Sequence, residues 1–188
     1  MRYIFAKFDS VRVLTGANKS RKLLSSVSEA TRPTSSRVRK SIFDILWSRV
    51  GIDEKSVLDL FAGTGSLGIE ALSRGASKAW FVDQSRSAIK VVKENLLRLG
   101  VDPMRYKVVT STYNSFLDGY QGERFDIAFL DPPYAFTNWD GLLEKVPAAI
   151  MVCETGNPIQ PPSGFEKLLE RKYGTTVVTL VSGSSSGI

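Results

Sequence analysis

The sequence predicts one α/β domain built on a mostly parallel, doubly wound β-sheet. From residue 56 onward, short apolar segments typical of buried strands alternate with segments of helical spacing. A glycine-rich segment stands directly between the first of these strands and the helix after it, a position typical of this fold class. The chain has 188 residues, of which 43% are hydrophobic, so it is long enough for one domain with its own core.

The first quarter of the chain predicts a β-hairpin and a helix that belong to this same domain. Residues 11–16 and 20–26 are short β-like segments on either side of a turn. Hydroxyl side chains at 34–36 can cap a helix over about 36–50, and Gly51 ends that helix.

The rest of the chain predicts a Rossmann-like core over 51–182 and a flexible, serine-rich tail over 183–188. Strands are expected at 56–61, 78–83, 106–110, 125–131 and 148–154. Helices are expected from the glycine-rich segment through Ser73, at 86–99 and near 164–171, and the chain is expected to end in a β-rich segment at 171–182.

Positive charge is concentrated in the N-terminal quarter. The net charge is +6, and residues 1–50 carry 11 Lys and Arg against three acids. Residues 51–188 carry 14 Lys and Arg against 16 Asp and Glu. This asymmetry indicates either a solvated helix face or a surface that contacts the phosphates of a nucleic acid.

The composition excludes several functions. The chain has no histidine and one cysteine, Cys153, so it cannot form a Ser-His-Asp or Cys-His catalytic group, and no metal site is expected. A lone cysteine cannot form a disulfide within the chain and suits a reducing compartment. No segment has the roughly 20 apolar residues of a membrane span, and the N-terminus lacks the apolar run of a signal peptide. We therefore expect a cytoplasmic protein without membrane contact.

The glycine-rich loop predicts a nucleotide-like ligand. Gly63, Gly65 and Gly68 have the spacing G-x-G-x-x-G after a strand and before a helix, which lets the backbone approach such a ligand. Asp83 ends the next strand, where its carboxylate can accept hydrogen bonds from both hydroxyls of a ribose. Both NAD and S-adenosylmethionine (SAM) fit these features. Glu70, in the helix after the loop, is expected on the surface.

Asp59 favours SAM over NAD. It lies in the first strand, four residues before Gly63, where it can orient the loop or hold a cationic amino acid moiety. A carboxylate there would repel a pyrophosphate, whereas SAM has a ribose and no phosphate.

The segment Asp131-Pro132-Pro133-Tyr134 follows an apolar strand, at the end that faces the ligand crevice in sheets of this class. The prolines leave the Asp131 side chain and the Pro132 carbonyl as fixed acceptors. Two acceptors aimed at a planar exocyclic amine favour its pyramidal, nucleophilic form, and Tyr134 can stack on the base. The segment predicts methyl transfer to a nucleobase amine, which needs neither histidine nor metal.

Together these motifs resemble a known family. Residues 57–76, 81–85 and 129–134 resemble class I SAM-dependent amino-methyltransferases. The block TRPTSSRVRKSIFDIL at 31–46 more closely resembles the RsmD family of bacterial 16S rRNA guanine-N2 methyltransferases, a resemblance that runs over about 11–181. It implies transfer of a methyl group from SAM to N2 of a guanine in 16S rRNA, free or in the assembling small ribosomal subunit. We expect the enzyme to be a monomer.

The resemblance also implies roles for individual residues. Arg37, Arg39 and Lys40 either reach the RNA or form a solvated helix face. It implies that the catalytic residues are Asp131, Pro132 and Tyr134. It implies that the cofactor is bound by Asp59, Ala62, Gly63, Gly65, Asp83, Gln84, Thr112 and Thr34, and that the substrate is bound by Arg32, Arg37, Arg39, Lys40 and Pro133.

Two features depart from the family pattern. Related enzymes often carry an acid after the third strand that binds the adenine amine, and here Thr112 or Asn114 stands in that region. The stretch between 134 and 148 is short for a full helix, so residues 138–140 begin a truncated helix or form part of a substrate loop.

Three other functions remain open. A DNA adenine-N6 methylase shares both motifs, but the chain leaves little room for a target-recognition domain. An NAD(P)-dependent oxidoreductase would use the glycine loop and Asp83 and leave the D-P-P-Y segment unused. A non-catalytic RNA-binding protein would use the basic N-terminus, although no motif residue is disrupted.

Overall fold

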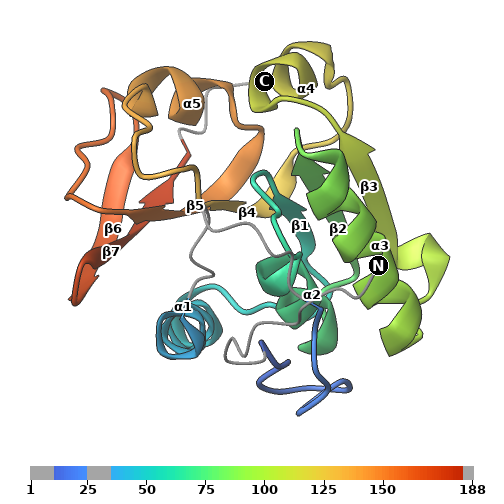
Figure 1. The fold of residues 1–188 in the computed structure, drawn as a ribbon. Coiled ribbons are helices and arrows are strands. Elements are labelled where there is room, and N and C mark those ends of the chain that lie inside the picture. The colour runs from blue at the N-terminus through green and yellow to red at the C-terminus, as the bar shows by residue number, and fades with distance from the viewer. Residues whose placement is uncertain (1–10, 25–34, 184–188) are drawn as a thin grey trace.

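The chain folds around a seven-stranded sheet with the order β3-β2-β1-β4-β5-β7-β6 (Figure 1). The computed structural model describes residues 11–24 and 35–183. The strands are β1 Ser56–Asp59, β2 Lys78–Asp83, β3 Tyr106–Thr110, β4 Phe125–Leu130, β5 Ala148–Thr155, β6 Glu166–Tyr173 and β7 Thr176–Ser182. The helices are α1 Ser36–Arg49, α2 Ser66–Ser73, α3 Arg86–Leu99, α4 Tyr113–Gly119 and α5 Trp139–Lys145, with a 3-10 turn at Pro103–Arg105.

The strands β1 to β5 run parallel, and β7 is antiparallel to both β5 and β6. The mostly parallel sheet is therefore confirmed. Because β1 lies between β2 and β4, the chain first builds one side of the sheet and then the other. The carboxyl ends of β1, β2, β4 and β5 consequently lie next to one another, where ligands bind in open sheets of this kind.

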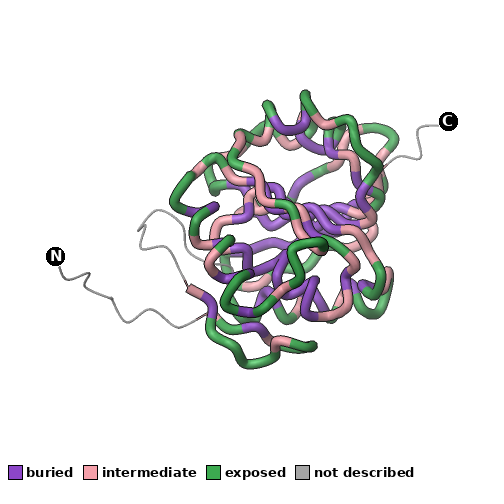
Figure 2. Tube along the Cα trace, turned by 90° about the vertical axis from the view of Figure 1, so that its right-hand side faces the viewer, coloured by how far each residue is buried: buried purple, intermediate pink, exposed green. Residues whose placement is uncertain are grey.

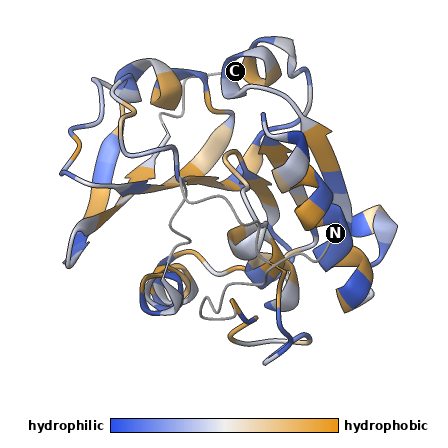
Figure 3. Cartoon of the chain, viewed as in Figure 1, coloured by the Kyte–Doolittle hydropathy of each residue, from blue (hydrophilic) through white to orange (hydrophobic). Residues whose placement is uncertain are grey.

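Helices cover both faces of the sheet. The side chains of α1, α2 and α3 pack on one face, and those of α4 and α5 pack on the other. The buried residues concentrate in the strands at the centre of the molecule (Figure 2). The covering helices carry both hydrophilic and hydrophobic residues, as expected for helices with one face on a sheet (Figure 3). In the part of the chain that the structure describes, no helix is long and apolar enough to cross a membrane.

The prediction of a short helix near 164–171 is wrong, because this segment forms the edge strand β6. It pairs with β7 over its whole length, with an irregularity between Lys167 and Leu169. The two strands are joined by a tight turn at Gly174, which has φ +62°. Pairing with the strongly β-forming β7 overrides the local helical spacing. The exposed charges of β6 also suit a sheet edge, because they disfavour pairing with a further strand.

Two short helices cover the second face. The sequence predicted no helix after β3, yet α4 begins there, with the Thr112 hydroxyl accepting a hydrogen bond from the Ser115 N–H at 3.2 Å. Of the two possibilities predicted for 138–140, the truncated helix is observed as α5, which follows the N-cap residue Asn138.

The predicted N-terminal helix is confirmed as α1, which is capped by the Ser35 hydroxyl. The predicted hairpin is present as a single antiparallel bridge between Arg12 and Lys22, and the segment packs on the core through buried Val13 and Leu23. Residues 11–24, the described part of the hairpin, form no strands, because their backbone bonds to α2 and α3 as well as to itself.

The predictions for Glu70 and Arg39 are both wrong, because each side chain is only 1% exposed. The Glu70 carboxylate accepts hydrogen bonds from Leu14 N–H, from Thr15 N–H and hydroxyl, and from Arg74 Nε, at 2.7–3.1 Å. Arg39 donates to the Arg12 carbonyl. Burial lowers the pKa of Arg39, and the charge of Glu70 raises it. Glu70 thus fastens the N-terminal segment to α2, and Arg39 fastens it to α1. Because its side chain is buried, Arg39 is not available to RNA.

Candidate active site

The loop between β1 and α2 uses its three glycines in different ways. Gly63 has φ +52°, and apart from its chain neighbours a β-carbon there would meet nothing nearer than the Phe61 carbonyl oxygen at 4.0 Å. Gly65, with φ +78°, is the N-cap residue of α2. At Gly68 a β-carbon would lie 2.3 Å from Phe81 Cε1. Gly63 thus leaves space for a ligand, Gly65 allows the backbone to turn, and Gly68 allows α2 to pack closely on the sheet.

Asp59 is buried at the end of β1 and holds this loop. Its Oδ2 accepts a hydrogen bond of 2.9 Å from the Gly68 N–H. Burial raises the pKa of Asp59 to about 7; the Gly68 hydrogen bond lowers it, and the charges of Asp131 and Asp83 raise it further. Asp59 therefore orients the loop, one of the two roles predicted for it, and a cation nearby would favour its charged form.

Asp83 holds the same loop from the end of β2. One carboxylate oxygen accepts a hydrogen bond from the Gly63 N–H at 2.9 Å, and the other accepts one from the Ser85 N–H at 2.8 Å. The buried Ala62 continues the pairing of the loop with the backbone of β2. Gln84, next to Asp83, is exposed. The half-buried Asp83 carboxylate thus sits directly beside the open Gly63.

Acidic side chains mark the carboxyl ends of four neighbouring strands. In sheet order they are Asp83 of β2, Asp59 of β1, Asp131 directly after β4, and Glu154 of β5. Alternate residues of a strand share a face. The residues two positions earlier all pack in the core under α1, α2 and α3: Phe81, Val57, Phe129 and Val152. The four acids therefore line one face of the edge. In the described ranges no group of three or more potential ligands is arranged to hold a metal ion.

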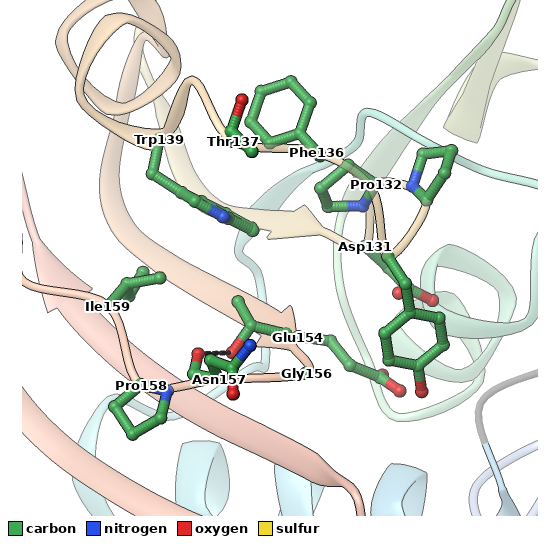
Figure 4. Close-up of a pocket in the computed structure, with 13 residues that line it drawn as sticks. Asp131, Pro132, Phe136, Thr137, Trp139, Glu154, Gly156, Asn157, Pro158 and Ile159 are labelled. Atoms are coloured by element: carbon green, nitrogen blue, oxygen red, sulfur yellow. Dashed lines mark hydrogen bonds between the residues drawn. The ribbon is translucent and has the colours of Figure 1, made fainter.

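A pocket of about 230 Å³ opens between the loops after β4 and β5. Apolar side chains line part of it, among them Phe136, Trp139 and Ile159. Figure 4 shows the Glu154 side chain extending toward Asp131, on the side of the pocket away from Trp139 and Ile159. The pocket thus combines an apolar wall with a side that carries two carboxylates.

Tyr134 stands at the mouth of this pocket and is 64% exposed. A β-carbon at Gly156 would lie 3.1 Å from Tyr134 Cδ1, so the ring edge rests on the backbone of the loop after β5. The Tyr134 hydroxyl lies 3.5 Å from Thr176 Oγ1. Pro132 is buried and Pro133 exposed. The ring therefore offers an aromatic surface to solvent beside the pocket.

The other predicted residues are not all at this edge. Thr112 is exposed, and its hydroxyl is occupied in capping α4. Arg37 and Lys40 are exposed on α1, and Lys40 pairs with a carboxylate one turn further along. Arg32 and Thr34 lie outside the described residues.

Sequence reasoning missed two features of the site. Glu154 had a detectable signal, because it is an acid at the end of an apolar strand whose carboxyl end lies beside the D-P-P-Y segment. The aromatic rings of Phe61, Tyr113 and Phe136 form a group with centroids 5.5–6.2 Å apart. It joins the loop after β1 to the loop after β4. The three rings come from segments far apart in the chain, so no local sequence pattern predicted this aromatic group.

Similarity to known proteins covers nearly the whole described chain. Residues 11–182 match the family model "Conserved hypothetical protein 95". The chain is 33% identical over 174 residues to "Ribosomal RNA small subunit methyltransferase D" of Haemophilus influenzae, covering 87% of this chain and 89% of that protein. The chain belongs to the RsmD family.

Two further relatives agree. The RsmD protein of Escherichia coli strain K12, "Ribosomal RNA small subunit methyltransferase D", is 38% identical over 135 residues, which cover 72% of this chain and 64% of that protein. A hypothetical protein of Thermus thermophilus has a solved structure with a TM-score of 0.77 and 32% identity, covering 92% of this chain and 99% of that one. The family resemblance predicted from the residues is confirmed.

Proposed function

We propose that the protein transfers a methyl group from SAM to N2 of a guanine in 16S rRNA of the small ribosomal subunit. Two relatives in its family are named as methyltransferases of small-subunit ribosomal RNA. The observation that carries the proposal is the position of Asp131 and Pro132 at the carboxyl edge, beside a glycine loop held by two other carboxylates. An activated methyl donor and a nucleobase amine can meet there.

The residues at the β1 and β2 ends fit SAM. Gly63 leaves open space where a side chain would stand, and the neighbouring Asp83 carboxylate, which already accepts the Gly63 N–H, can also accept hydrogen bonds from ribose hydroxyls. The row of acids favours a ligand with positive charge and disfavours a pyrophosphate, which speaks against an NAD-dependent enzyme. SAM supplies an activated methyl group, because its methyl carbon is bonded to a positively charged sulfur.

Asp131 and Pro132 would prepare the amine. The Asp131 carboxylate and the Pro132 carbonyl accept hydrogen bonds from the two N2 hydrogens, which favours the pyramidal form with an available lone pair. As N2 bonds to the methyl carbon, the bond between that carbon and the sulfur of SAM would break, and neutral S-adenosylhomocysteine would leave. N2 must also lose one hydrogen as a proton, and the Asp131 carboxylate takes that proton. Positioning and electrostatics account for the rate, without metal or histidine.

Tyr134 and the basic N-terminal residues would hold the RNA. The exposed Tyr134 ring stacks on the target base. Arg37 and Lys40 on α1 remain candidates for phosphate contacts, and Arg32 is a candidate from its sequence alone. We infer that the protein is a monomer and that it acts in the cytoplasm, where the small subunit is assembled. We also infer that the N-terminal segment anchored by Glu70 is part of the catalytic domain.

The test is a methyl-transfer assay with labelled SAM. Under-methylated small ribosomal subunits, naked 16S rRNA and duplex DNA are offered in parallel, and the products are digested so that the modified nucleoside and its position are identified by mass. We expect N2-methylguanosine from a ribosomal substrate, and the substrate used identifies the assembly state that is recognised. N6-methyladenine from DNA would keep the chemistry and overturn the proposed substrate. No methylation of any of them, together with tight NADH binding, would favour the oxidoreductase.

A further inference from the structure

We propose that Glu154 is a specificity-determining residue that reads the N1–H of the target guanine. The inference rests on the proposed function and goes beyond it, because it assigns the choice of base to a residue outside the D-P-P-Y segment. Three observations carry it: the register of β4 and β5, the burial of Glu154 in the wall of the pocket, and the fit between two adjacent carboxylates and the edge of guanine.

The strand register places Glu154 beside Asp131. In the parallel pair of β4 and β5, Leu130 lies opposite Cys153. Continuing each strand by one residue brings Asp131 opposite Glu154. Paired residues of adjacent parallel strands point to the same face, about 4.8 Å apart in their backbones. Figure 4 agrees, since the Glu154 side chain extends toward Asp131. The group that orients N2 thus has a second carboxylate as its neighbour.

The position of Glu154 is well defined. β5 lies between β4 and β7, and Glu154 is paired with Val178 of β7 on its other side. It is only 8% exposed, and it lines the pocket. The next residue, Thr155, donates its hydroxyl to the Asn157 carbonyl at 2.6 Å, which holds the following loop. Hydrogen bonds are stronger where water is largely excluded. Because the Glu154 side chain is largely shielded from water, its carboxylate suits a ligand in the pocket that carries hydrogen-bond donors.

The donors of guanine match this pair. On its Watson–Crick edge, guanine carries N1–H directly beside the N2 amine, so two neighbouring acceptors can bind both. With Asp131 and Pro132 on N2, the carboxylate of Glu154 accepts from N1–H. Adenine has a lone pair on N1, which a carboxylate repels. Glu154 therefore favours guanine over adenine, independently of the methyl-transfer chemistry that both share.

The experiment replaces the methylated guanine with bases that separate N1–H from the other groups. The position is the one that the wild-type protein methylates in the assay above, and the RNA is ligated from two pieces and assembled into small subunits. 6-Thioguanine keeps N1–H and the N2 amine. 2-Aminopurine keeps the amine but has a lone pair on N1. We expect the wild-type protein to methylate guanine and 6-thioguanine at similar rates, and 2-aminopurine roughly 10- to 100-fold more slowly in kcat/KM.

Glu154→Gln then tests the residue itself. The glutamine amide can donate to the N1 lone pair of 2-aminopurine and accept from the N1–H of guanine, so the preference for guanine should fall by at least about 10-fold. Glu154→Ala should also lower the preference, without improving 2-aminopurine. Glu144→Gln, at an exposed position of α5, is the matched control and should leave the preference unchanged. SAM affinity and circular dichroism check that each variant is folded.

The outcomes separate this inference from the proposed function. A wild-type protein that methylates no guanine overturns both. If the protein forms N2-methylguanosine but methylates guanine and 2-aminopurine at equal rates, the inference that N1–H is read is overturned, while the proposed function stands. The same holds if the protein rejects 6-thioguanine as strongly as 2-aminopurine. An unchanged preference in a folded Glu154 variant assigns the discrimination to another residue. If neither variant folds, the rates of the wild-type protein on the three bases still decide whether N1–H is read.

Discussion

The two halves of the carboxyl edge of the sheet are built in different ways. At the ends of β1 and β2, the carboxylates of Asp59 and Asp83 accept hydrogen bonds from backbone N–H groups of the glycine loop and of the turn after β2. At the ends of β4 and β5, the site consists of two consecutive prolines, an exposed Tyr134 and a pocket between loops. In the first half, carboxylate side chains stabilise the backbone of the loop, whereas the second half presents side chains to a ligand.

This difference predicts what substitutions do. In the first half a side chain holds the backbone that would bind the cofactor, so a change there alters folding and cofactor affinity together. In the second half the proposed groups act on the substrate directly, so a change there alters turnover and leaves the fold intact. Four measurements test this comparison, from the largest expected effect to the smallest.

Asp131→Ala should give the largest effect. Loss of one preorganised hydrogen-bonding group in an active site lowers turnover by about 100- to 1,000-fold, and loss of the proton acceptor adds to this. Methyl transfer should therefore fall below detection, while SAM affinity, measured by calorimetry, stays within a few-fold. Asp140→Ala, at an exposed position of α5, is the control. Equal activity in Asp131→Ala would refute the proposed site.

The glycines separate folding from binding within the first half. Gly68→Ala would place a methyl group 2.3 Å from the Phe81 ring, so the free energy of unfolding should fall by about 1–3 kcal/mol. Gly63→Ala meets open space and should lower stability by about 1 kcal/mol through its positive φ, while SAM affinity falls at least about 10-fold. Urea denaturation and calorimetry on both variants check this. Similar SAM affinity in Gly63→Ala and wild type would contradict the assignment of the open side.

Tyr134→Ala should weaken RNA binding without affecting the fold. Stacking of a base on an aromatic ring contributes about 1–3 kcal/mol, so the KM for the ribosomal substrate should rise roughly 10- to 100-fold. The side chain is exposed, so the free energy of unfolding should change by no more than about 0.5 kcal/mol. Tyr134→Phe keeps the ring and should behave like wild type. A similar loss in both variants would show that the hydroxyl, not the ring, is needed.

The pH dependence of stability tests the burial of Asp59. Its pKa is about 7 in the folded protein and near 3.8 in the unfolded chain, so between these values the folded state binds the proton more tightly. The contribution of Asp59 to stability is therefore lost as pH rises, by about 1 kcal/mol between pH 6 and pH 8. Asp59→Asn should remove this decline, measured by urea denaturation at both values. The chain has no histidine to titrate in this window. If the free energy of unfolding changes with pH in the same way in the wild-type protein and in Asp59→Asn, then Asp59 behaves as an ordinary, exposed carboxylate.

Local sequence determined most of the fold and the core of the candidate site. The alternation of strands and helices, the glycine loop and the D-P-P-Y segment are each contiguous, and their physical requirements can be read within a few residues. Helix α1 and its hydroxyl cap were predicted for the same reason. The edge strand β6 was not, because its own residues favour a helix and its pairing with β7 decides the outcome.

The tertiary structure alone decided which charged residues are buried. Glu70 bonds to residues 55 and 56 positions away in the chain, and Arg39 contacts the carbonyl of Arg12. Glu154 becomes a neighbour of Asp131 through the order of the strands. The free energy of a charged side chain depends on the groups around it, and those groups come from distant segments. The sequence by itself therefore determined the chemistry of its motifs, whereas only the packed structure decided that Arg39 and Glu70 serve as an anchor and that two acids face one pocket.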